Sequence, residues 1–71
     1  MACHEEYCTE YKPQLILEQA ALLRRIDGLA LFMGSDQFKS LPDDEQNRIR
    51  LQFGIMGEYW DTLQLRIKFC D

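Results

Sequence analysis

The chain has 71 residues, a net charge of −4 and 46% hydrophobic residues. Such a length allows one domain, which buries only about 60% of the surface of its unfolded chain and needs very good packing, a metal, disulfides or self-association. The composition is that of a folded protein and argues against disorder. The acidic balance argues against a surface that binds nucleic-acid phosphates directly.

The start of the chain resembles no targeting segment. It has neither a basic start nor an apolar run, and no stretch approaches the roughly 20 apolar residues of a membrane span. We therefore expect a cytosolic protein without membrane contact, whose three cysteines are reduced.

Residues 1–11 are predicted to be a polar lead-in, and residues 12–71 a single helical domain. A first long helix is predicted over 13–33, because proline is favoured at the first helical position and Pro13 precedes an apolar pattern. Gly34 is a plausible C-terminal cap. The pattern has spacings of seven, four, three and four and consists of Leu15, Leu22, Ile26, Leu29 and Met33.

A short helical connector and a second long helix, over 42–69, are predicted to follow. Ser35 can cap the connector, and Phe38 is its apolar anchor. Ser40 followed by Asp43 resembles a capping box for the second helix. This helix has its own apolar seam, formed by Ile49, Phe53, Met56, Trp60, Leu63 and Ile67. Two such seams predict an all-α fold, an antiparallel two-helix hairpin.

The second helix has more apolar surface than one partner helix can cover. Self-association into a homo-oligomeric helical bundle is the simplest physical answer, because large exposed apolar patches are a liability on a monomer. The predicted oligomer interface consists of Leu51, Ile55, Tyr59, Leu65 and Phe69.

No residue pattern predicts catalysis or a cofactor. The lone histidine lies in the lead-in, and neither a nucleophile with a nearby base nor a phosphate loop is present. Cys3, His4, Cys8 and Cys70 have the composition of a zinc site, but not a recognised spacing. We expect free thiols, no metal and no enzyme activity.

Two columns of residues spaced seven apart flank the seams. One contains Glu18, Arg25 and Phe32 on the first helix, and the other contains Gln52, Tyr59 and Arg66 on the second. Arginine beside aromatic side chains is suited to holding phosphates and stacking bases. The alternative is an interhelical salt bridge, such as Glu18 to Arg66, with Tyr59 packed at a subunit boundary.

The chain resembles a family of small bacteriophage proteins related to a crAss-like phage protein. The similarity spans residues 18–67 and rests on residues 22–29, residues 32–42, Glu45, Gln46, Gln52, Met56, Tyr59, Leu63, Arg66 and Ile67. The resemblance implies a helical accessory protein in the cytoplasm of an infected bacterial host. It carries over no catalytic residues. Small phage accessory proteins often antagonise bacterial immunity, which is an argument by analogy.

Our first functional hypothesis is therefore a sponge, which binds a nucleotide-derived immune messenger between subunits and does not cleave it. The messenger would be of the cyclic-dinucleotide or ADP-ribose type. Arg25 and Arg66 are predicted to hold its phosphates. The residues predicted to stack on its bases are Phe38, Tyr59 and Trp60.

Two alternatives remain open. One is an inhibitor that docks on a host defence protein, as an acidic nucleic-acid mimic, through Asp43, Asp44, Glu45, Glu58 and Asp61. The other is a structural or assembly protein without a ligand.

Overall fold

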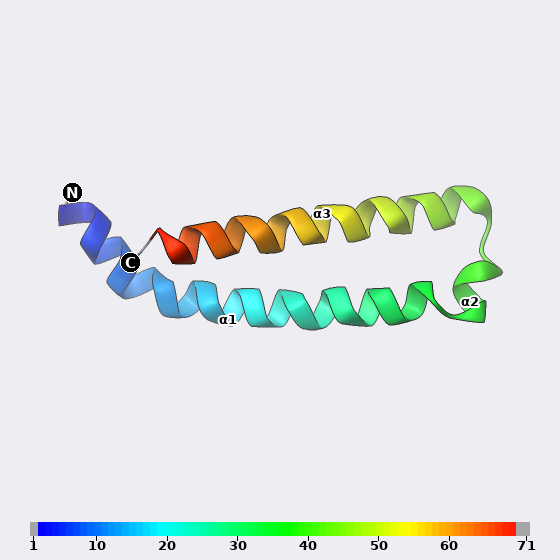
Figure 1. Cartoon of the computed structure of the whole chain (residues 1–71), viewed down its shortest axis with the longest axis horizontal. Helices are drawn as coiled ribbons and strands as arrows, with labels where there is room; N and C mark the ends of the chain where they lie inside the picture. The colour runs from blue at the N-terminus through cyan, green and yellow to red at the C-terminus, as the bar shows by residue number, and fades with distance from the viewer. Residues whose placement is uncertain (1, 70–71) are drawn as a thin grey trace.

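The fold is a long, thin helical hairpin. The computed structural model describes the backbone of residues 2–69 and the side chains of residues 11–69. Over these residues it has no strand and three helices, α1 (Ala2–Met33), α2 (Asp36–Lys39) and α3 (Asp43–Lys68). The helices α1 and α3 lie side by side and antiparallel, and α2 closes one end (Figure 1). The predicted all-helical hairpin with a short connector is confirmed.

The first helix begins earlier than the sequence predicted. It starts at Ala2 rather than at Pro13, so that Pro13 lies inside it. A proline within a helix removes one backbone hydrogen bond and crowds the preceding turn, which bends the helix but does not always end it. The first turns of α1 accordingly run at an angle to the rest (Figure 1).

Ser35 begins the connector as predicted. Its Oγ accepts a hydrogen bond from the backbone N–H of Phe38 at 3.2 Å and donates one to the carbonyl of Phe32 at 2.5 Å. Gly34, in contrast, is not a left-handed cap, because no described glycine has a positive φ. The chain leaves α1 through a tight turn instead, in which the Gly34 N–H donates to the Leu31 carbonyl at 3.2 Å.

The capping box predicted for α3 is not formed. Pro42 occupies the N-cap position, so Ser40 lies too far upstream to reach the free N–H groups, and its Oγ donates to the Gln37 carbonyl at 2.7 Å. The Gln46 side chain instead joins the connector to α3. Its Nε2 donates to the carbonyls of Lys39, at 3.2 Å, and Leu41, at 2.8 Å.

The core is a single layer of side chains between α1 and α3. Its centre is formed by Leu15, Leu22 and Leu63, and the partly buried residues packed against them are Ile26, Met56, Trp60 and Ile67. The molecule measures 53 × 17 × 13 Å and its radius of gyration is 16.2 Å, whereas a compact domain of this length has about 11 Å. The hairpin therefore exposes an unusually large share of its surface.

The excess of surface is large. The chain exposes 5560 Å², whereas a compact protein of 8.4 kDa exposes about 4600 Å².

No helix among the described residues combines the length and the apolar character that crossing a membrane requires.

Candidate ligand-binding groove

An open groove of about 590 Å³ runs between α1 and α3. A smaller hollow of about 230 Å³ adjoins it on the side of Glu18 and Ala21. Pockets for small ligands usually measure about 300–1,000 Å³, so the groove is of the right size for a small ligand. The groove is lined by Leu22, Arg25, Gly28, Leu29, Phe32, Gln52, Met56 and Tyr59.

The groove is where the two predicted polar columns meet. Residues seven apart lie two turns apart on the same side of a helix, so Arg25 and Phe32 form one wall. Gln52 and Tyr59 form the opposite wall from α3. Because the helices are antiparallel, Arg25 lies on the side of Tyr59, and both residues line both hollows.

Arg25 is the charged residue of the groove lining. It has no ion pair or side-chain hydrogen bond with any residue that the structure describes, so its guanidinium donors are available to a ligand. A guanidinium can bind a phosphate with two parallel hydrogen bonds. Tyr59 lines the groove beside it and is 44% exposed, and the floor formed by Leu22 and Met56 is apolar. The groove thus combines a cationic side chain, an aromatic side chain and an apolar floor.

Glu18 is the carboxylate of the smaller hollow. It has no ion pair within the described part of the chain, so the Glu18–Arg66 salt bridge considered from the sequence is not formed. A carboxylate here gives the smaller hollow a negative charge close to Arg25, whereas the part of the groove at Phe32 and Gln52 has no carboxylate in its lining.

Phe38 is a core residue of the connector rather than part of the groove lining. It is 4% exposed and packs edge-on against Phe32, with ring centroids 5.9 Å apart. The guanidinium carbon of Arg50 lies 5.3 Å from the centre of its ring. Phe38 therefore supports Phe32, which lines the groove in its place.

Trp60 and Arg66 are also absent from the lining. Trp60 packs against the central core, where its indole N–H is buried without an acceptor in the described residues. Of the five residues predicted to bind ligand, the structure thus brings together Arg25 and Tyr59. Phe32, Gln52 and Gly28 complete the lining. The seven-residue columns already pointed to Phe32 and Gln52.

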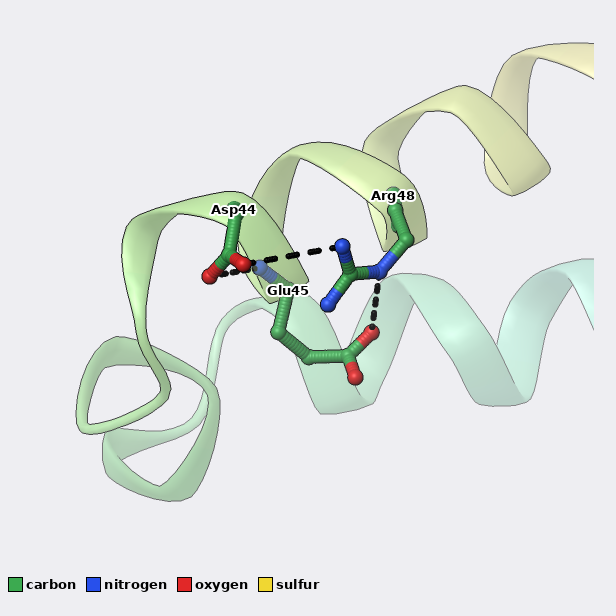
Figure 2. A network of polar contacts seen from close by, with 3 residues as sticks. All are labelled: Asp44, Glu45 and Arg48. Carbon is green, nitrogen blue, oxygen red and sulfur yellow. Dashed lines mark hydrogen bonds and ion pairs between the residues drawn. The ribbon is translucent and has the colours of Figure 1, made fainter.

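The acidic group at the start of α3 is partly neutralised. Arg48 lies between two of its carboxylates, with Nη1 3.6 Å from Asp44 Oδ2 and Nε 3.4 Å from Glu45 Oε1 (Figure 2). The Asp44 carboxylate also accepts a hydrogen bond from the Glu45 backbone N–H at 3.0 Å. These contacts stabilise the first turn of α3 and weaken the negative surface that a nucleic-acid mimic requires.

The zinc ligands considered from the sequence lie outside the residues whose side chains are described. They are Cys3, His4, Cys8 and Cys70. Among residues 11–69, no group of three or more His, Cys, Asp or Glu side chains is placed to hold a metal ion.

Fold and groove together define a small helical-hairpin protein with an open, ligand-sized groove. The chain belongs to the Sequestin family, whose sequence model matches residues 9–69. The match includes every residue of the groove and leaves out all three cysteines. No solved structure matches the chain. The more specific link to crAss-like phage proteins stays a prediction.

Proposed function

We propose that this protein is a homo-oligomeric sponge, which binds a nucleotide-derived signalling molecule in the groove and keeps it from its receptor. The family name denotes sequestration. The observation that carries the proposal is that Arg25, without an ion pair or side-chain hydrogen bond among the described residues, and an exposed Tyr59 come from different helices and line one groove.

The lining favours a ligand with a phosphate and a planar base. The guanidinium of Arg25 binds the phosphate, and the aromatic side chains of Tyr59 and Phe32 contact the base. The Gln52 amide can donate to and accept from the polar edge of that base. A cyclic dinucleotide or an ADP-ribose derivative carries both groups.

Sequestration without cleavage is part of the proposal. Glu18 is the carboxylate that lines the smaller hollow, and the lining of the larger one includes neither a histidine nor a carboxylate. Hydrolysis usually requires an acid and a base in hydrogen-bond reach of the reacting bond. We further propose, from the sequence resemblance, that the protein is made by a bacteriophage and acts against host immunity in the cytoplasm of the infected cell.

The direct test is to mix the purified full-length chain with cyclic di-AMP, cyclic di-GMP or ADP-ribose and to measure binding by calorimetry. The bound nucleotide is then recovered by heat denaturation and identified by mass spectrometry. We expect at least one of these probes to bind and to be recovered intact. Recovery of a cleaved product indicates an enzyme, and failure of all three to bind contradicts the proposal.

Variants of the groove sharpen this test. Arg25→Ala is expected to weaken binding about 10- to 100-fold, because a charge-assisted hydrogen bond to phosphate is lost. Glu18→Gln is expected to strengthen it roughly two- to fivefold by removing a repulsive charge. The matched control is Arg24→Ala, since Arg24 is exposed and does not line the groove. Equal effects of the Arg24 and Arg25 substitutions would argue against the site.

Docking of the acidic surface on a host defence protein has less support, because Arg48 already pairs with Asp44 and Glu45. This alternative predicts that reversing the charge of Asp43 and Asp44 abolishes capture of one host protein while nucleotide probes fail to bind. A ligand-free assembly protein predicts neither interaction.

A further inference from the structure

The exposed surface of the hairpin is in excess by the amount that one more interface covers. Its 5560 Å² exceed the area of a compact protein of this mass by about 950 Å². A standard protein–protein interface covers about 800 Å² on each partner. One interface on each chain is therefore enough to give the molecule an ordinary surface.

The exposed apolar residues of α3 form a second seam, which we name the outer strip. It consists of Leu51, Ile55, Glu58, Thr62, Leu65 and Phe69, at spacings of four, three, four, three and four. Its four apolar members are 52–69% exposed. These spacings are those of a helix–helix contact, and the residues lie on the side of α3 that faces away from the core residues Leu63 and Met56.

The outer strip is complementary to itself when it is read in the opposite direction. Its midpoint is residue 60, and each member has a counterpart at the same distance on the other side. In an antiparallel pair of α3 helices, Leu51 therefore faces Phe69 of the second copy, and Ile55 faces Leu65. A two-fold interface requires this reciprocity, in which residue i meets residue j and j meets i.

The two polar members also match. In the same register, the Glu58 carboxylate faces the Thr62 hydroxyl of the second copy. Within one chain, Thr62 Oγ1 donates to the backbone carbonyl of Glu58 at 2.9 Å. A hydroxyl can rotate toward a new acceptor, so a hydrogen bond to the carboxylate of the second copy is available.

We propose that two copies of this chain pair through their outer strips, with the α3 helices antiparallel and a two-fold axis near residue 60. The four long helices then form one layer with both α3 helices at its centre. Rotation about an axis perpendicular to the layer leaves each groove on the same face. Tyr59 lies on the groove side of α3, so the Tyr59 residues of the two copies flank the axis between the two grooves.

The pairing is tested on the full-length chain under reducing conditions, without nucleotide, by sedimentation equilibrium. We expect a reversible dimer. Ile55→Lys and Leu65→Glu are each expected to raise the dissociation constant about 100-fold, because each places an unpaired charge in an apolar contact. The double variant is expected to recover dimerisation to within about tenfold of the unsubstituted chain, since Lys and Glu then face each other in the antiparallel register.

The matched control is Leu23→Lys. Leu23 is a 43% exposed leucine on α1 that is not part of the outer strip, and its substitution is expected to change the dissociation constant less than threefold. Circular dichroism checks that each variant keeps its helices. We expect the helices to be kept, because the substituted residues are exposed.

Three results overturn the pairing: a monomer at all concentrations, a control as disruptive as Ile55→Lys, or a folded double variant that stays monomeric. This test does not depend on nucleotide binding. A dimer that binds no nucleotide probe contradicts nucleotide binding but not the pairing. A nucleotide-bound monomer contradicts the pairing and the homo-oligomeric part of the proposed function, but not binding in the groove.

Discussion

At the residue scale, Gly28 is a glycine within α1 whose position makes the groove sensitive to an added side chain. It lines the groove between Arg25 and Phe32, and a Cβ atom at this position would meet no atom within 4 Å. Glycine inside a helix costs about 1 kcal/mol relative to alanine. Because Gly28 lines the groove and has open space at its Cβ position, a side chain here would occupy part of the groove.

We predict that Gly28→Ala raises the free energy of unfolding by about 0.5–1 kcal/mol and also weakens nucleotide binding about tenfold, because the added methyl group enters the groove. Gly57→Ala is the matched control. Gly57 also has open space at its Cβ position but does not line the groove. Its substitution should stabilise the chain equally and leave the affinity unchanged. Denaturant unfolding measures the change in stability, and calorimetry measures the change in affinity. An equal loss of affinity in both variants would mean that entry of the methyl group into the groove does not cause the loss.

At the scale of the elements, the ends of the helices differ in how far local signals determined them. Ser35 reaches the free Phe38 N–H from the N-cap position, so its residue type was sufficient to predict the cap. Pro13 was not a sufficient signal, because α1 continues through it to Ala2. A proline at the first turn and a proline at a bend have the same local sequence appearance.

Ser35→Ala is predicted to lower the free energy of unfolding by about 1 kcal/mol, since it removes the bonds to the Phe38 N–H and the Phe32 carbonyl. Thermal and denaturant unfolding measure this loss. Ser40→Ala removes only an exposed bond to the Gln37 carbonyl, and its effect should stay within about 0.5 kcal/mol. If the two substitutions are equally destabilising, the cap of α2 is not what holds the connector.

For the whole molecule, thinness is the dominant property. Leu15, Leu22, Phe38 and Leu63 are the buried hydrophobic residues among 11–69, and a small domain rarely gains more than about 3–5 kcal/mol from one such core. If the hairpin completes its packing with a second copy, unfolding is coupled to dissociation and the measured stability depends on protein concentration.

We accordingly predict that the melting temperature rises by a few degrees for each tenfold increase in protein concentration, because the dimer gains about 1.4 kcal/mol by mass action. Ile55→Lys should melt at a lower temperature at each concentration, because its dimer is weaker. Differential scanning calorimetry over a hundredfold concentration range measures both. A melting temperature of the unsubstituted chain that is independent of concentration would mean that the monomer is the stable unit.

The sequence by itself determined that two long helices flank a short connector, but not where α1 begins. It also determined their two seams and the columns that contain Arg25 and Tyr59, because residues spaced three, four and seven apart share one side of a helix whatever that helix packs against. Only the tertiary structure decided which columns meet. The rotation and register of α1 against α3 depend on how side chains of distant residues interlock, and no local spacing contains that information. Packing therefore placed Arg25 and Tyr59 in one groove, and it buried Phe38 under Phe32 and Trp60 against the core.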